Sequence, residues 1–574
     1  MTASLTRRVD ELLAGAFAAC GLPTETARAS RASRPELADL QCNGVMPLAK
    51  AAGRNPRELA AAIATALGER AEFDEVGVAG PGFLNLRLSA GFLAECAAAQ
   101  ASDHAHAGIE QVDTGLVMLD FGGPNVAKPL HVGHLRTLVI GESLRRILDA
   151  QGVRTLSDTH LGDWGLQMGM LLSELRLRFP DQPPGTLPPL TEHDLQVLYP
   201  EAAAACRADP ARMDAARAAT AALQAGDPDA YKVWSELRRI SLEAQTRDFD
   251  LLGAHFDLLL GESDVQPLIP GMIADLRERG IAVESEGALI VEVATPDEAK
   301  PMPPLLLAKS DGAALYATTD VATLLARKRE HDPARIIYVV DQRQALHFEQ
   351  VFRAARRAGY ADGIELIHAG YGTVNGPDGK PYKTREGNAA QLSDLLGDAI
   401  ERAAERLPET TPDAERETLA RLVGLAAVKF ADLSSFRTSG YIFDAERMVS
   451  FEGRTGPYVQ YACVRIGSIL AKAASQGASA GPIAVTAPAE RALVLECARL
   501  PDVVASASRN LAPNEIADYV FALAQSFSRF YSECPVLAAD TDAERGSRLA
   551  LCALTRMVME KALWLLGIAV PERM

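Results

Sequence analysis

Apolar residues recur at two different spacings near the N-terminus, and each spacing predicts one kind of element. Two segments have the three-to-four-residue period of a helix, and two others alternate as strands do. The turn Gly80-Pro81-Gly82 separates the two strand segments, so we expect them to pair. Residues 1–111 are therefore predicted to form a small α+β domain, with a linker over 98–114. The expected helices and strands are 9–19, 56–67, 76–78 and 83–88.

Strand and helix patterns alternate from residue 116 onward. Apolar runs predict strands at 116–119, 155–159 and 336–340, and a helical period covers 135–148. Such alternation is typical of a doubly wound parallel sheet with helices on both faces. Residues 112–389 are therefore predicted to be a Rossmann-type α/β domain.

Two further parts of the chain are predicted to be mainly helical. A proline-rich loop and Ala- and Arg-rich helices occupy 179–285, and strands resume at 289–293 and 304–307, so we expect an insertion into the α/β domain. Later apolar periods predict connecting helices over 390–455 and an all-α bundle over 456–574. Most aromatic residues of one bundle helix have the spacing of a core stripe. They are Tyr519, Phe521, Phe527, Phe530 and Tyr531.

Composition narrows the class of protein. A hydrophobic content of 48% with 23% charged residues is that of a folded soluble chain. No apolar run reaches the roughly 18 residues of a membrane helix, and the N-terminus is polar, so we expect a cytoplasmic protein without a membrane partner. The eight cysteines include no Cys-x-x-Cys pair, which argues against a structural zinc site. The net charge of −17 argues only weakly against nucleic acid, because a local basic surface is enough for binding.

One turn of the predicted parallel sheet contains residues suited to phosphate chemistry. It runs from Asp120 to His134 and joins a strand to the next helix, whose free N–H groups attract phosphate. Lys128 adds a mobile cation, and His131 and His134 share one helical face. Gly133 leaves room for a flat ring between them. The two histidines are also compatible with a surface pair or with metal ligands, although no third ligand lies beside them.

Other polar residues follow the later strands, at the edge where open α/β sheets bind ligands. Gly162-Asp163-Trp164-Gly165 predicts either a close approach to a ligand or a packed helix entry. Tyr316 and Asp320 share one face of a predicted helix. The segment after residue 340 contains Gln344 and His347, and for His347 alone a structural role is favoured.

A turn-rich segment after residue 371 carries three cations, Lys380, Lys383 and Arg385. Such a loop can close on phosphates. Taken alone, its composition favours a solvated turn.

In this order, these pieces resemble an arginyl-tRNA synthetase of class I. His131-Val-Gly-His134 matches the HIGH signature of the class, and Pro124 to Arg136 matches the longer form found in the arginine enzymes. The second class signature, KMSKS, is replaced by Lys380-Pro-Tyr-Lys383-Thr-Arg385, and the resemblance implies that Lys128 replaces its missing charge. Arg454 stands where the family usually has asparagine. The other matching segments are Gly162–Gly165, Tyr316–Asp320, Arg343–His347, Phe451–Tyr461 and Pro571–Met574.

The resemblance implies a class I α/β catalytic domain, an N-terminal domain and a C-terminal anticodon-binding bundle that both contact tRNA, and a monomer. It implies that arginine and ATP, accompanied by Mg²⁺, give arginyl-adenylate and pyrophosphate, and that arginine then passes to the 3′-terminal adenosine of its tRNA. The implied catalytic residues are His131, His134 and Lys128. The implied ATP-binding residues are His131, Gly133, His134, Lys128, Lys380, Lys383 and Arg385. The implied arginine-binding residues are Asp120, Asn125, Tyr316, Asp320 and Gln344, and the implied tRNA-facing residues are Tyr458, Gln460 and Tyr461.

Two other classes of function are compatible with the same fold. A non-catalytic tRNA-binding paralogue would keep the fold without needing both histidines, Lys128 and the acids. An adenylating enzyme that passes arginine to another acceptor would not need an anticodon domain. Both are disfavoured by the residues present.

Overall fold

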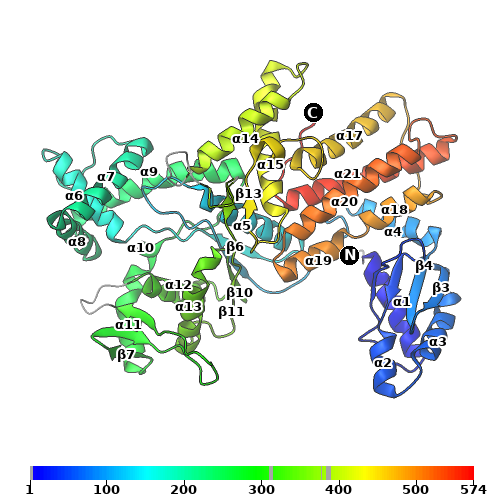
Figure 1. Cartoon of the computed structure of the whole chain (residues 1–574), viewed down its shortest axis with the longest axis horizontal. Helices are drawn as coiled ribbons and strands as arrows, with labels where there is room; N and C mark the ends of the chain where they lie inside the picture. The colour runs from blue at the N-terminus through cyan, green and yellow to red at the C-terminus, as the bar shows by residue number, and fades with distance from the viewer. Residues whose placement is uncertain (1–3, 309–314, 377, 383–389) are drawn as a thin grey trace. The chain divides into compact units, whose positions relative to one another are not determined.

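The computed structural model of the chain describes residues 4–308, 315–376, 378–382 and 390–574 (Figure 1). The chain forms two compact units. The first consists of Met1–Val112, Ala403–Ser434 and Met448–Met574, and the second of Asp113–Arg402 and Ser435–Arg447.

A four-stranded parallel sheet lies at the centre of the second unit. Its strand order is β11-β10-β5-β6, so the first strand along the chain, β5, lies between the second and the third. The strand order therefore reverses between β5 and β10, and ligands of doubly wound sheets bind outside the carboxyl ends of the strands at such a point. The predicted parallel sheet and fold class are confirmed. The strands are β5 (Val117–Asp120), β6 (Thr155–Asp158), β10 (Arg335–Tyr338) and β11 (Glu365–His368).

Helices connect these strands and form the inserted segment. The helix α6 and the inserted helices α7 and α9 pack around a core that includes Trp164 and Trp234, whose rings meet edge to face at 5.0 Å. In Figure 1 these helices lie together in cyan and teal. The helices of the unit are α5 (Val132–Ala150), α6 (Leu166–Arg178), α7 (Glu192–Ala208), α8 (Pro210–Gln224), α9 (Pro228–Leu252), α10 (Glu262–Val265), α11 (Ile269–Glu278), α12 (Tyr316–Glu330) and α13 (Ala345–Ala358), with 3-10 turns η1 (Gln266–Leu268) and η2 (Gln342–Gln344).

The strands predicted at 289–293 and 304–307 exist, but they do not join the parallel sheet. They correspond to β8 (Ala288–Val291) and β9 (Leu305–Ala308), which form a separate antiparallel sheet with β7 (Ala282–Ser285). A parallel pair needs a crossover, usually a helix, and the proline-containing connection between β8 and β9 has none. The short connection favours antiparallel pairing instead.

The N-terminal part of the first unit is an antiparallel sheet of order β1-β2-β4-β3 with four helices. The linker expected at 98–114 is partly wrong, because α4 continues to Ser102. Gln100 of this helix is buried and donates from Nε2 to the Cys497 carbonyl at 3.0 Å. The elements are α1 (Leu5–Ala19), β1 (Ala29–Arg31), β2 (Leu40–Cys42), α2 (Val45–Ala52), α3 (Pro56–Gly68), β3 (Phe73–Ala79), β4 (Phe83–Leu88) and α4 (Ala90–Ser102).

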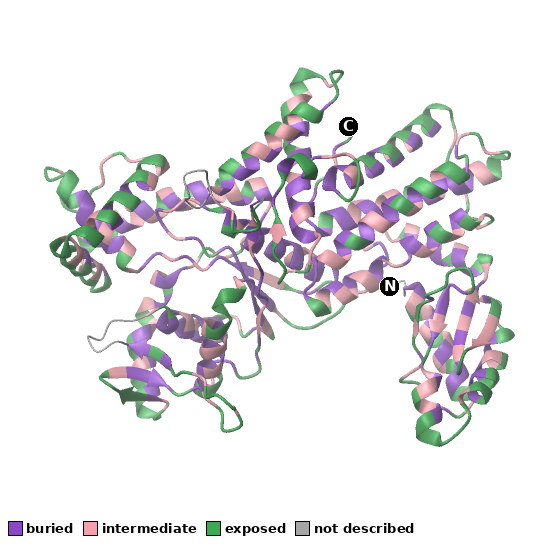
Figure 2. Cartoon of the chain, viewed as in Figure 1, coloured by how far each residue is buried: buried purple, intermediate pink, exposed green. Residues whose placement is uncertain are grey.

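The rest of the first unit is a helical bundle whose buried residues face inward (Figure 2). Tyr519, Phe527 and Phe530 are buried, as their spacing predicts. The bundle helices are α15 (Asp413–Leu433), α17 (Gly456–Ser475), α18 (Pro488–Cys497), α19 (Leu500–Asn510), α20 (Asn514–Glu533) and α21 (Asp542–Leu565). Four short or shared elements complete the fold: α14 (Leu392–Arg406), α16 (Ala445–Met448), and the parallel pair β12 (Val374–Asn375) and β13 (Tyr441–Ile442).

Two features are absent from the described residues. None of their helices combines the length and apolarity that crossing a membrane requires. No group of three His, Cys, Asp or Glu side chains in this part of the chain is arranged to hold a metal ion.

Candidate active site

The turn between β5 and α5 is fixed by backbone contacts at the sheet edge. Gly122 has a φ of +91°, and a Cβ there would lie 2.8 Å from Thr159 Oγ1. The N–H groups of Gly122 and Gly123 donate to the hydroxyls of Thr137 and Thr159 at 2.9 and 3.1 Å. Glycine is therefore needed where the chain leaves the strand and passes close to its neighbours.

His131 and His134 form a capping arrangement at the start of α5. His131 is the N-cap, and its Nδ1 accepts a hydrogen bond from the Gly133 N–H at 3.0 Å. Nδ1 of His134 accepts one from the His131 N–H at 3.0 Å, and the two ring centroids are 4.0 Å apart. Because Nδ1 is the acceptor in both neutral rings, the proton resides on Nε2. Each histidine thus presents one N–H donor beyond the helix start.

Both imidazoles are neutral at physiological pH. Burial, the neighbouring His131 and the charge of Lys128 lower the pKa of His134 to about 3, although its hydrogen bond acts in the opposite direction. Burial, Lys128 and Arg343 also lower the pKa of His131. Two neutral donors can stabilise developing negative charge without the solvation that cations require.

The absence of a side chain at Gly133 makes room for the His131 ring. A Cβ at this position would lie 2.7 Å from Cε1 and 2.9 Å from Nδ1 of His131. The flat ring that Gly133 accommodates is therefore the imidazole of His131.

The loop before these histidines is held by the inserted segment and the segment after β6. A Cβ on Gly162 would lie 2.5 Å from Asn125 Oδ1, so the glycine permits this packing. Gln167 donates to that oxygen at 3.3 Å, Gln245 donates to the Asn125 carbonyl at 2.9 Å, and Ser241 accepts from the Ala127 N–H at 2.9 Å. Asn125 is partly exposed in this arrangement. Asp163 is bound within the fold by Arg238 and Ser263 and is not free for a ligand.

Tyr316 and Asp320 lie on the first turns of α12. Tyr316 is 68% exposed, and Asp320 Oδ2 lies 2.6 Å from Nε2 of His347 on α13. The histidine therefore fixes one oxygen of the carboxylate. The structural role favoured for His347 is thus that of a partner to Asp320.

Glu262 is a site residue that the sequence did not reveal. Burial raises its pKa to about 7; Asp163 and Asp320 add to this effect, whereas His160 and the Trp164 N–H oppose it. Glu262 is 6% exposed, and its charge also acts on Tyr316. Among the described residues, neither Glu262 nor Asp320 forms an ion pair with a lysine or an arginine, so the two acids concentrate negative charge. The local sequence before Glu262 is an apolar run, Leu258–Leu260, followed by glycine.

The structure does not place Asp120 in this acidic pair. Arg327 of α12 donates from Nη2 to Oδ2 of Asp120 and of Asp158, each at 2.6 Å, and from Nη1 to the Tyr338 hydroxyl at 3.1 Å. All four side chains are buried. Arg327 bonds only Oδ2 of Asp120, and a carboxylate can accept further hydrogen bonds on its second oxygen. The direct binding of arginine by Asp120 stays a prediction.

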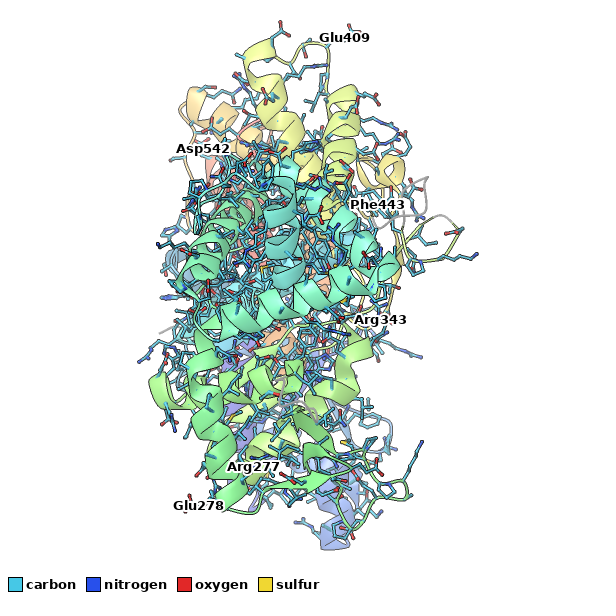
Figure 3. The ribbon with its side chains drawn as sticks, turned by 90° about the vertical axis from the view of Figure 1, so that its left-hand side faces the viewer. Arg277, Glu278, Arg343, Glu409, Phe443 and Asp542 are labelled. Carbon is cyan, nitrogen blue, oxygen red and sulfur yellow. The ribbon has the colours of Figure 1, made fainter. Side chains whose placement is uncertain are left out.

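The segment of Gln344 and the segment after β11 are joined by a bridge between Asp341 and Tyr371. Gln344 is exposed at the end of η2, after Arg343, which pairs with Asp341 and is marked in Figure 3. Lys380 is exposed, whereas Lys383 and Arg385 lie outside the described residues. Where the description resumes, the Ala390 carbonyl accepts from the Val132 N–H at 3.0 Å, beside the two histidines.

The first unit contains the residues expected to face tRNA. Gln460 is fully buried and donates from Nε2 to the Ala569 carbonyl at 2.6 Å, which corrects its assignment to a tRNA-facing surface. Tyr461 is 44% exposed and Tyr458 is partly exposed. Arg454 pairs with Asp518 of α20, which gives this unusual residue a partner.

Comparisons with known proteins agree with this organisation. Residues 98–445 match the catalytic domain of class I tRNA synthetases (R), residues 459–574 the DALR anticodon binding domain, and residues 4–88 the arginyl tRNA synthetase N-terminal domain. The chain is 48% identical over 586 residues to an arginine–tRNA ligase of Maricaulis maris and 47% identical over 592 residues to one of Hyphomonas neptunium, with all of both chains covered in each case.

Solved structures of arginyl-tRNA synthetases have the same fold as this chain. The arginyl-tRNA synthetase of Thermus thermophilus, 27% identical, matches with a TM-score of 0.79 over 99% of this chain and 100% of its own. The fold is also that of the Plasmodium falciparum arginyl-tRNA synthetase, 24% identical, with a TM-score of 0.83 over all of both chains. A catalytic-domain match over more than half of its length and a 48% identical relative along its whole length show that this chain belongs to the class I arginyl-tRNA synthetase family.

Proposed function

We propose that this arginine–tRNA ligase activates arginine at the edge of the sheet where β5 and β10 end. The observation that carries the proposal is that the second unit contains two kinds of group suited to the two substrates. Neutral histidine donors stand at the start of α5, and an acidic pair is formed by Glu262, at the start of α10, and Asp320, in the first turns of α12. The first suits a phosphate group undergoing attack, and the second suits a cationic side chain.

Activation joins the arginine carboxylate to the α-phosphate of ATP. A carboxylate oxygen forms a bond to the α-phosphorus, the bond from that phosphorus to the bridging oxygen breaks, and pyrophosphate leaves with the electron pair. In our proposal Nε2–H of His131 and of His134 donates to the phosphate oxygens as their charge grows. Lys128 contributes a positive charge to the same oxygens, and Gly133 keeps the His131 ring in place.

Recognition of arginine rests on the acidic pair. Asp320, oriented by His347, and Glu262 accept hydrogen bonds from the guanidinium, and Tyr316 lies beside them. We assign Asn125 and Gln344 to the α-amino and carboxylate end of the substrate. A pocket with two carboxylates rejects neutral amino acids, because they would leave the charges unpaired.

Transfer to tRNA completes the reaction. A hydroxyl of the 3′-terminal adenosine attacks the carbonyl carbon of arginyl-adenylate and AMP leaves. We keep Tyr458 and Tyr461 as tRNA-facing candidates and Lys380, Lys383 and Arg385 as phosphate contacts.

The remaining partners follow from the substrates. Mg²⁺ enters with ATP and is held by its phosphates. We propose a monomer that works in the cytoplasm.

A charging assay tests the proposal. Purified protein is expected to form arginyl-tRNA from arginine, ATP and arginine tRNA, and to form no lysyl-tRNA from lysine and lysine tRNA. The His134→Ala variant, compared at matched thermal stability, is expected to lose turnover. A folded wild-type protein without arginine charging would overturn the proposal.

A further inference from the structure

Lys128 has an aromatic partner from the inserted segment. Its Nζ lies 4.7 Å from the ring centroid of Tyr199, on the inserted helix α7. This distance is within the range of a cation–π interaction. Among the residues that the structure describes, no carboxylate forms an ion pair with Lys128, so the Tyr199 ring is the group that holds its ammonium.

The position of Tyr199 is fixed by the packing of α7. A capping box formed by Thr191 and Asp194 starts the helix, with the Thr191 hydroxyl and the Asp194 carboxylate each bonded to the other residue's N–H. Leu195 and Leu198 are buried in the core of the insertion, and part of the Tyr199 ring packs against the same core. The ring therefore presents its face to Lys128 from a rigid support.

The same core includes the loop that carries Lys128. Val126 and Ala127 are buried in it together with Trp164, and Ala127 has a φ of +60°. The insertion thus supports both the ammonium and the backbone next to it. Lys128 acts electrostatically on His131 and His134, so its charge lies near the proposed triphosphate position.

We propose that Tyr199 is a positioning residue for Lys128, which holds the ammonium beside the two histidines before ATP binds. A lysine side chain has four rotatable bonds and loses much freedom when it is fixed. An aromatic face that restrains it lowers this loss at the step where phosphate is bound. The inference rests on the proposed role of Lys128 in binding the triphosphate. It also gives the inserted segment a function in ATP binding.

A double-mutant cycle tests the link between the two residues. Charging is measured at saturating arginine and tRNA with varied ATP, for wild type, Tyr199→Leu, Tyr199→Phe, Lys128→Met and the Tyr199→Leu/Lys128→Met double variant. We expect Tyr199→Leu to lower kcat/KM for ATP about three- to tenfold. Tyr199→Phe keeps the ring face and is expected to retain activity. In the Lys128→Met background, Tyr199→Leu is expected to cause no further loss.

A control and several outcomes separate this role from simple packing. Tyr231→Leu removes a ring of the same insertion that contacts Trp234 rather than a lysine, and it is expected to leave kcat/KM for ATP unchanged. Equal losses from Tyr199→Leu with and without Lys128 would overturn the inference, as would a loss in Tyr199→Phe as large as in Tyr199→Leu. An effect confined to KM for tRNA would also overturn it. Absence of charging by wild type would instead refute the proposed function.

Discussion

We predict that Glu262 makes arginine binding depend on pH, by an amount that can be calculated. Its pKa of about 7 is that of the protein without arginine, where burial and the nearby Asp163 and Asp320 disfavour the charged form, and His160 partly offsets them. A guanidinium binds the ionised carboxylate. Binding of arginine below pH 7 therefore requires that Glu262 first lose its proton.

The size of the effect follows from the fraction of ionised Glu262. With a pKa of about 7, about one tenth of the protein carries the charged carboxylate at pH 6 and about nine tenths at pH 8. The value of kcat/KM for arginine reports the free enzyme, so it is expected to rise about tenfold over this interval. His134, with a pKa of about 3, does not titrate in this range.

The assay is charging at varied arginine, with saturating ATP and tRNA, between pH 6 and 8. Glu262→Gln keeps the size of the side chain and an acceptor for the Trp164 N–H, but it cannot ionise. We expect this variant to show lower kcat/KM for arginine at pH 8, by about tenfold or more, and little change with pH. If the variant kept the tenfold pH dependence of wild type, the assignment of that dependence to Glu262 would be wrong.

Four further predictions follow from the same site. His134→Ala is expected to lower kcat about 10²- to 10³-fold with little change in KM for arginine, because it removes a donor to the charged phosphate; steady-state charging kinetics measure this. Asp320→Ala is expected to raise KM for arginine more than it lowers kcat, and an unchanged KM would contradict the pocket. Gly133→Ala is expected to lower kcat, whereas Gly165→Ala, where a Cβ would meet nothing within 4 Å, should leave kcat unchanged. Glu262 ionises near pH 7 in the folded protein but near 4.5 when unfolded, so the folded state loses up to about 3 kcal/mol of stability as the pH rises between these values; Glu262→Gln is therefore expected to have a higher Tm than wild type at pH 8 but not at pH 4.

Local pattern was enough to predict the turn that carries the histidines. The strand before Asp120 and the helix after His131 each have their own apolar period, and a strand-to-helix turn in a parallel sheet lies at the ligand-binding edge wherever the other strands lie. The antiparallel sheet after residue 281 could not be predicted from local pattern. Its strands have the same composition as those of the parallel sheet, and pairing depends on the connection between them.

The partner of a charged side chain could not be predicted in the same way. Arg327 lies 207 residues after Asp120 in the sequence, and no pattern at either position indicates that they meet. Glu262 stands in a segment rich in charged residues, most of which are solvent-exposed. The long-range contacts of the fold decide which acid is paired and which is left with excess charge.

The carboxylates at the sheet edge differ in their partners. Asp120 and Asp158 already share the guanidinium of Arg327, so the fold itself satisfies their charge and they secure neighbouring strands. Glu262 and Asp320 repel one another, and His347 is the charged partner of Asp320 among the described residues. A buried carboxylate with a raised pKa destabilises the folded protein at neutral pH, and we propose that an arginine substrate removes that penalty on binding. In this proposal the protein uses one guanidinium of its own to build the site and leaves a second position for the guanidinium of its substrate.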